Sequence, residues 1–301
     1  MSPASRRRPL LHTAVASAVL LSGSAATTVY VKAQAHDATA PVSQTSAAEG
    51  GSPVPSPSPS VDRDARLAEA LDGLEGSYSV AVLDAAAGTS AAYATDAGAT
   101  YDTASIVKVD VLAALLLRAQ DDGRPLTAQE RAHAAAMIRS SDNSATTALW
   151  DTIGGADGLD AANERFGLTG TTGGAGPLWG LTQTTAADQL VLLQQVFGTD
   201  GDSVLDADAR AYVQGLMENV ESDQRWGVSA AGGDGLALKN GWLRRSTTEL
   251  WDINSVGRVT VGGRRYLIAV VSAGNATKDA GIALVEAVAR AAVPVLSGDD
   301  A

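Results

Sequence analysis

The order in which strand-like and helical patterns follow one another limits the fold of this chain more than any other feature. Residues alternate as in a strand over Ser77–Leu83 and near Ala91–Thr95. Helical spacing then dominates from about Ala104 to Val220. Strand-like alternation returns only after this stretch, in three further segments: Leu236–Lys239, Leu250–Val261 and Arg265–Ser272. Two strands, a helical block and three strands are therefore expected, in that order.

Helical segments also flank the strands, at Val61–Leu74 and Asp279–Leu296, and Gly262-Gly263 marks a hairpin turn between the last two strands. We expect an α+β fold in which the terminal helices face a five-stranded antiparallel sheet. The insert, about 104–220, is expected to be an all-helical subdomain that forms one wall of a cleft. Glycine and proline predict breaks in it at Asp121–Pro125, Gly154–Gly158 and Gly167–Gly180.

The residues before position 61 are expected to lie outside this fold. Three arginines at positions 6 to 8 precede an apolar run that ends in Ala33-Gln34-Ala35, the pattern of a secretory signal with its cleavage site. Residues 1–35 are therefore predicted to be a signal peptide, with an uncleaved membrane anchor as the alternative.

Residues 36–60 contain almost no apolar bulk and end in a Ser-Pro repeat, which predicts a disordered linker. The folded domain is then 61–301. We expect it to be secreted or extracytoplasmic, with the N-terminal segment as a tether to the membrane or cell wall where that segment is retained.

Several classes of function are excluded by composition. The chain has no cysteine, and two of its three histidines precede position 61, which leaves His133 for the folded domain. A zinc centre built from histidine or cysteine is therefore excluded, and His133 is interpreted as a helix-surface residue rather than a catalytic base. We expect no metal and no cofactor. A net charge of −12 repels phosphate backbones, so we expect no nucleic-acid binding.

Ser105-Ile106-Val107-Lys108 opens the first long helical segment of the insert. Residues three apart share a helix face, so the Ser105 hydroxyl and the Lys108 amine can meet. The backbone N–H groups of a helix start favour a developing oxyanion. A buried lysine beside a second cation can lose its proton and act as a base. The pattern therefore predicts a serine nucleophile with a lysine base.

Two further motifs follow in the chain. Ser141-Asp142-Asn143 begins another amphipathic helix; it is either a helix cap or a catalytic group with Ser141 as proton relay and Asn143 as substrate ligand. Lys239-Asn240-Gly241 is expected to end the first strand of the C-terminal group. There Lys239 would bind a substrate carboxylate, and Gly241 would let the substrate lie close to the strand.

These motifs, in this order and on these elements, are the signature set of class A β-lactamases and penicillin-binding proteins. The sequence resembles that superfamily over most of Val61–Leu296 and looks closest to class A β-lactamases. The resemblance implies Ser105 as nucleophile, Lys108 as base and Ser141 as proton shuttle, with Asn143, Lys239 and Gly241 binding substrate. It also implies an oxyanion hole formed by the backbone N–H groups of Ser105 and Trp242.

The chain departs from the class A pattern at the step that releases the acyl group. Class A enzymes activate the hydrolytic water with a glutamate in a loop that corresponds here to Arg165–Ala187, which contains no carboxylate. Glu164 and Asp188, which flank this loop, are the alternatives for a missing base. Asn240 also replaces the usual threonine or serine, and only 36 positions separate Ser105 from Ser141.

We therefore expect an exported serine hydrolase that forms an acyl-enzyme with β-lactams or D-Ala-D-Ala-like peptidoglycan peptides and deacylates slowly. A non-hydrolytic penicillin-binding or wall-sensing module is the alternative, and an unrelated secreted binding protein with coincidental motifs is a third. We expect a monomer.

Overall fold

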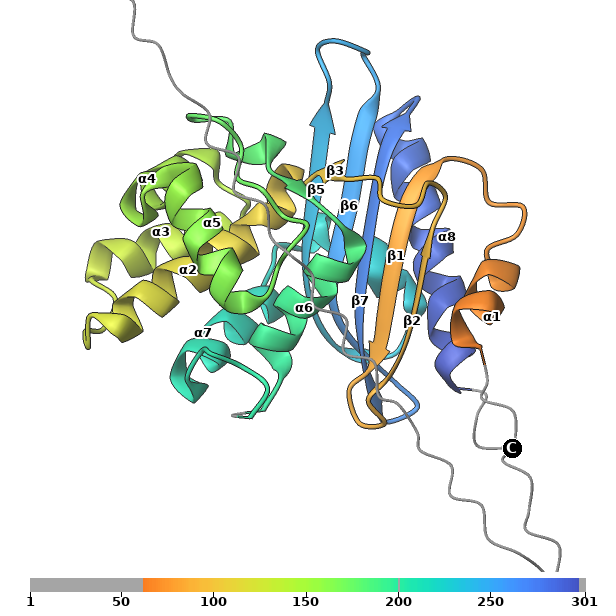
Figure 1. Ribbon diagram of the computed structural model, residues 1–301, viewed down its shortest axis with the longest axis horizontal. Coiled ribbons are helices and arrows are strands. Elements are labelled where there is room, and N and C mark those ends of the chain that lie inside the picture. The colour runs from red at the N-terminus through yellow and green to blue at the C-terminus, as the bar shows by residue number, and fades with distance from the viewer. Residues whose placement is uncertain (1–61, 200, 298–301) are drawn as a thin grey trace, which may run out of the picture. The chain divides into compact units, whose positions relative to one another are not determined.

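The computed structural model describes residues 62–199 and 201–297. The predicted signal peptide and linker lie outside the described residues. The described residues belong to one compact unit, Ser58–Ala301, in which a sheet and a group of helices lie side by side (Figure 1).

A five-stranded antiparallel sheet forms the centre of this unit, in the order β2-β1-β7-β6-β5. Its strands are β1 (Ser77–Asp84), β2 (Thr89–Ala94), β5 (Asp234–Arg244), β6 (Trp251–Val261) and β7 (Arg264–Asn275). The two N-terminal strands thus add to the C-terminal hairpins through β1 and β7. This arrangement confirms the predicted fold class.

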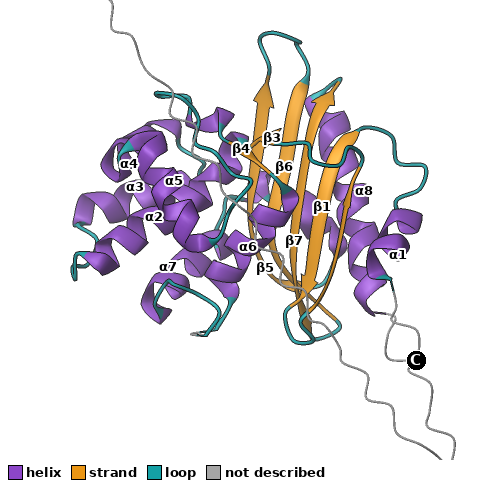
Figure 2. Ribbon diagram, viewed as in Figure 1, coloured by secondary structure: helices purple, strands orange, loops and turns teal. Residues whose placement is uncertain are grey.

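Both faces of the sheet are buried, and the side chains of β1 alternate between them. Tyr78, Val80 and Val82 pack against the terminal helices α1 (Arg63–Ala70) and α8 (Lys278–Ser297). Ala81 and Leu83 point to the other face, where the core includes the central helices (Figure 2). The helix α8 has the length and hydropathy of a membrane span, but Val285, Val288 and Ala292 bury its inner side against the sheet.

Six helices make up the predicted insert among the described residues. They are α2 (Val107–Asp121), α3 (Ala128–Arg139), α4 (Asn143–Ile153), α5 (Gly155–Phe166), α6 (Ala186–Phe197) and α7 (Ala207–Glu218). The helix α2 is buried along nearly its whole length, whereas α6 contacts β1, β6 and β7. The insert therefore joins the sheet through one continuous apolar core.

Three local expectations were wrong. The predicted break over Gly154–Gly158 is one residue long, because α5 begins directly after Gly154; Gly154 and Gly155 both have a positive φ, 100° and 68°. The short strand β4 (Gln183–Thr184), which pairs with β3 (Tyr101–Asp102), lies inside the stretch predicted to be helical or loop (Figure 2). The motif Lys239–Gly241 lies in the middle of β5, which is longer than predicted.

Asp84 joins two chain reversals at one end of the sheet. Its buried carboxylate accepts hydrogen bonds from the backbone N–H groups of Ala86 and Ala87 at 2.9 and 3.0 Å, and from Arg264 Nε at 2.8 Å. Burial alone would raise the pKa of Asp84, but the bonds from Ala87, Ala86 and Arg264 together hold it below its ordinary value.

We predict that Asp84→Asn lowers the free energy of unfolding at pH 7 by about 1–3 kcal/mol, because charged hydrogen bonds are lost. A depressed folded-state pKa contributes stability above the unfolded pKa, and this is lost as pH falls through the folded value. The difference from wild type should therefore shrink below about pH 4. Urea unfolding at pH 7 and pH 3 measures it, with the exposed Asp72→Asn as control. An equal loss at both pH values would contradict the role of the charge.

Candidate active site

A cleft of about 520 Å³ lies between the edge strand β5 and the helical subdomain. Three of the predicted site residues, Ser105, Asn143 and Trp242, line it. Its other walls are the segment Pro177–Leu181 and the hairpin that connects β5 to β6. Among the described residues that line this cleft, none carries a carboxylate.

Ser105 lies in a short 3-10 turn, η1 (Ala104–Ile106), and α2 begins only at Val107, so the expectation that Ser105 opens the long helix was wrong by one turn. The preceding residue, Ala104, has a φ of 46°, in the left-handed region that non-glycine residues rarely adopt. Backbone strain of this kind often accompanies functional sites. Among the described residues, Ser105 Oγ has no hydrogen-bond partner and faces the cleft.

Lys108 is fully buried beneath the cleft. Its Nζ donates to the carbonyl oxygen of Ser141 at 2.7 Å, to Ser141 Oγ at 3.0 Å and to Asn143 Oδ1 at 2.8 Å. Lys108 thus binds the Ser-Asp-Asn motif, whereas the predicted contact between its amine and the Ser105 hydroxyl is not among these hydrogen bonds. Ser141 itself has a positive φ of 56°, and Asp142 caps α4 through the N–H of Ala145, so the motif serves as a helix cap as well.

Lys239 approaches the same hydroxyl from the sheet. Its Nζ donates to Ser141 Oγ at 3.0 Å and to the carbonyl of Asn240 at 2.9 Å, and its side chain is fully buried. Residues from α2, from the start of α4 and from β5 therefore meet at one oxygen atom.

Burial dominates the electrostatics of this pair of lysines. It lowers the pKa of Lys108 to about 7, against an opposing and smaller effect of the Asp142 carboxylate. Burial, and then the charge of Lys108, lower the pKa of Lys239 well below its ordinary value. One ammonium beside another is unfavourable, so a neutral amine at one of the two relieves the repulsion. A base is thus available near neutral pH without any histidine.

Gly241 brings β5 against the backbone of Ser105. A Cβ at this position would lie 2.7 Å from the Thr103 carbonyl oxygen and 2.8 Å from Ser105 N. Only glycine fits there without a shift of the backbone. Trp242, the next residue on β5, also lines the cleft, and its backbone N–H stays the predicted second donor of the oxyanion hole.

The side chain of Asn240 points away from the cleft. Its Nδ2 donates to the carbonyls of Gln224 and Trp226, at 2.8 and 3.0 Å. Asn240 therefore does not take the place of a hydroxyl in the cleft. Its side chain instead holds β5 to the segment that contains Gln224 and Trp226.

Sequence reasoning missed Asn254, a fully buried residue of β6. Its Nδ2 donates to the carbonyls of Asp102 and Thr103, and its Oδ1 accepts from Ser272 N at 3.0 Å. Asn254 thus holds the segment immediately before Ser105 onto the sheet. No motif marks it, because a single asparagine in a strand becomes recognisable only when its partners are known.

The outer wall of the cleft is fixed by ion pairs. Arg245 of the β5–β6 hairpin binds the Asp102 carboxylate, and Gln183 Nε2 also donates to Asp102. Burial, followed by the adjacent Asp102 carboxylate, raises the pKa of Asp252 to about 6. The neighbouring Arg244 pairs with Glu249. Both hairpin arginines are therefore engaged with acids of this chain.

The alternatives for a missing base do not line the cleft. Asp188 is buried, and its Oδ2 accepts from Gly170 N at 2.8 Å and from Thr171 Oγ1 at 2.7 Å. Glu164 is exposed on α5. The loop between them instead presents Trp179, whose ring centroid lies 5.0 Å from Lys108 Nζ.

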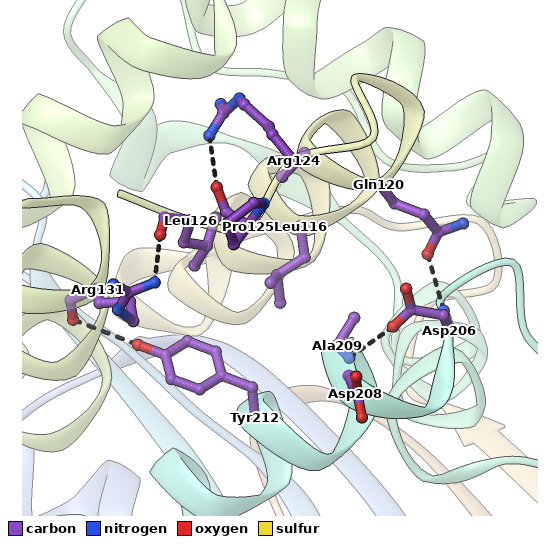
Figure 3. A pocket seen from close by; sticks show the side chains of 11 residues that line it. Leu116, Gln120, Arg124, Pro125, Leu126, Arg131, Asp206, Asp208, Ala209 and Tyr212 are labelled. Atoms are coloured by element: carbon purple, nitrogen blue, oxygen red, sulfur yellow. Dashed lines mark hydrogen bonds between the residues drawn. The ribbon is translucent and has the colours of Figure 1, made fainter. Parts of the chain in front are cut away.

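A second hollow, of about 290 Å³, lies in the helical subdomain between α2, α3 and α7 (Figure 3). Arg124 and Arg131 at its edge donate to the backbone carbonyls of Pro125 and Leu126, and Tyr212 donates to the carbonyl of Arg131. It contains none of the three motifs, so the cleft at Ser105 is the candidate active site.

Comparison with known proteins identifies the family and the fold of this chain. The model of the beta-lactamase enzyme family matches residues 117–296, more than half of the chain. The matched range includes Ser141 and Lys239 and begins after Lys108. No curated relative matches the sequence.

Similar folds occur among solved structures of β-lactamases. The TLA-1 extended-spectrum β-lactamase has 14% identity and a TM-score of 0.67, over 78% of this chain and 98% of that one. A class A β-lactamase from Bacteroides cellulosilyticus has 15% identity and a TM-score of 0.65, over 80% and 100%. A β-lactamase from Burkholderia vietnamiensis has 20% identity and a TM-score of 0.65, over 79% and 98%. At these identities the likeness shows the fold.

We predict that Gly241→Ala lowers the free energy of unfolding by about 1–3 kcal/mol, because the added methyl group forces η1 and β5 apart. Gly215→Ala on α7 is the matched control, since nothing lies within 4 Å of its Cβ position. It should be neutral or stabilise by up to about 1 kcal/mol, because alanine favours helix. Thermal and urea unfolding measure both, and equal effects of the two substitutions would contradict the close approach at Ser105.

Proposed function

Because this chain belongs to the beta-lactamase enzyme family, we propose that it is an active-site-serine hydrolase that forms an acyl-enzyme through Ser105. Its proposed substrates are β-lactams or the D-Ala-D-Ala-like peptides of peptidoglycan, and its proposed place of action is outside the cytoplasm. One observation carries the assignment: two buried lysines, Lys108 and Lys239, donate to the hydroxyl of Ser141 beneath a cleft that Ser105 lines.

The first half of the reaction uses groups that the site contains. Ser105 Oγ attacks the carbonyl carbon of the lactam and gives its proton to neutral Lys108. The backbone N–H groups of Ser105 and Trp242 stabilise the resulting oxyanion. The carbon–nitrogen bond then breaks, and the Ser141 hydroxyl passes a proton to the leaving nitrogen. Hydrogen bonds from Lys108 and Lys239 to Ser141 connect these proton transfers.

Substrate binding is assigned to the residues around this path. Asn143 lines the cleft and presents its amide to a substrate carbonyl, while its Oδ1 accepts from Lys108. Lys239 supplies positive charge for the substrate carboxylate, acting together with Ser141, and Gly241 keeps β5 close to Ser105.

The second half of the reaction has no evident base. Hydrolysis of the ester requires a water and a group that takes its proton, and no carboxylate is found among the described residues that line the cleft. We therefore propose slow deacylation. The same observation favours the second candidate function, a penicillin-binding or wall-sensing module that acylates and does not release.

We predict that the purified chain gains the mass of one penicillin, and that the adduct is missing in Ser105→Ala, since no other nucleophile is expected to react. Intact mass spectrometry over time measures both results. Slow loss of the adduct supports the hydrolase, and a permanent adduct supports the module. An adduct on Ser105→Ala would overturn the assignment of the nucleophile.

We predict that the rate of acylation falls about tenfold per pH unit below about pH 7, because protonation of Lys108, whose pKa is about 7, removes the base. Above this pH the amine is neutral and the rate should level off. Adduct formation measured between pH 5 and 9 gives the profile, and Lys108→Ala should abolish the rate near pH 7. A rate that stays constant from pH 7 to pH 5 would exclude Lys108 as the base.

A further inference from the structure

Trp179 lies over the amine of Lys108. It begins the short 3-10 turn η2 (Trp179–Leu181), and its ring centroid lies 5.0 Å from Lys108 Nζ. Its indole N–H donates to Thr147 Oγ1 at 3.3 Å, and its ring packs against the core of the helical subdomain. The ring is therefore held by both a hydrogen bond and apolar contact.

The other directions around Lys108 Nζ are filled. The carbonyl oxygen of Ser141, Ser141 Oγ and Asn143 Oδ1 each lie within 3.0 Å of it. Protonated Lys108 has three N–H donors, and these three partners accept all of them; neutral Lys108, the form that takes the proton of Ser105, keeps two donors and has one lone pair. The indole, whose ring centroid lies 5.0 Å from Nζ, narrows the access of water to that lone pair.

The segment that carries Trp179 is fastened at several points. Trp150 Nε1 donates to the carbonyl of Gly176 at 3.0 Å, and Gly174 N donates to Thr182 Oγ1 at 3.0 Å. Thr182 N in turn donates to the carbonyl of Trp179 at 3.1 Å. These bonds reach the loop from α4 and from the loop itself, so they fix the backbone that carries the indole.

Release of an acyl group needs a water between the ester at Ser105 and the base that takes its proton. The water oxygen must bond to the acyl carbon while a base takes its proton; the bond from that carbon to Ser105 Oγ then breaks, and Oγ regains a proton. Lys108 is the group near Ser105 with a pKa close to neutral. It can accept a proton from water only where water can touch it.

We propose that Trp179 is a positioning residue that excludes water from Lys108 and thereby lengthens the lifetime of the acyl-enzyme. This inference rests on the proposed function, because it concerns the ester formed at Ser105. Slow release then has two causes: the indole of Trp179, and the lack of a carboxylate among the described residues that line the cleft.

The lifetime of the penicilloyl adduct tests the proposal, followed by intact mass spectrometry after removal of free penicillin. In Trp179→Ala the lifetime should shorten by at least about tenfold, a fraction of the roughly 100- to 10,000-fold gain that general base catalysis provides. In Trp179→Phe, which keeps an aromatic ring over Lys108, it should stay within about threefold of wild type. Trp179→Leu is the second variant, for use if Trp179→Ala does not fold. It keeps apolar volume against the core but covers less of Lys108, so it should also shorten the lifetime of the adduct.

Crystal structures of the unreacted wild type and of Trp179→Leu provide a readout that does not need acylation. We expect a water within hydrogen-bond distance of Lys108 Nζ in the variant and none in the wild type. A water on Nζ in the wild type, or unchanged adduct lifetimes in folded variants, would overturn the proposal. A wild type that forms no adduct would instead overturn the proposed function, and the two crystal structures would still decide whether Trp179 excludes water.

Discussion

Two lysine side chains buried around one serine hydroxyl are the constraint to which the rest of the site is adapted. Burying an ammonium group is costly unless hydrogen bonds and nearby charge offset the loss of water. Lys108 and Lys239 share Ser141 Oγ, and their remaining bonds go to carbonyl and amide oxygens. Burial lowers the pKa of each lysine, and the charge of Lys108 lowers that of Lys239 further. Burial of the two lysines lowers the free energy of unfolding, and it provides a neutral amine near pH 7.

Meeting at that hydroxyl requires unusual backbone positions close to it. Ala104 and Ser141 both adopt positive φ values, and Gly241 lies against Ser105 where a methyl group does not fit. Such positions persist only where the surrounding structure holds them. Asn254 supplies part of that hold, since it fixes the backbone of Asp102 and Thr103 to the sheet. Two of the three described non-glycine residues with a positive φ, Ala104 and Ser141, therefore lie at or beside a residue to which we assign chemistry.

The loop opposite the sheet gives the cleft an apolar and aromatic character. Leu178 and Trp179 line one wall and Trp242 and Leu243 the other, while the hairpin arginines are paired with acids of the chain itself. A cleft built in this way suits the formation of an ester at Ser105 better than its hydrolysis, because apolar walls hold few waters. These walls therefore support the proposed slow release of the acyl group.

The sequence by itself determined the class of fold and the three motifs, because both depend on local patterns: alternation in Ser77–Leu83, and the helix caps and spacing around Ser105 and Ser141. The strand order, the mid-strand position of Lys239 and the inward turn of Asn240 toward Gln224 depended on tertiary structure. So did Asn254 and the placement of Trp179 over Lys108. The Lys108–Trp179 and Asp102–Asn254 contacts join residues 71 and 152 positions apart, and no local pattern records such contacts. The direction of the Asn240 side chain depends on which face of an edge strand is covered.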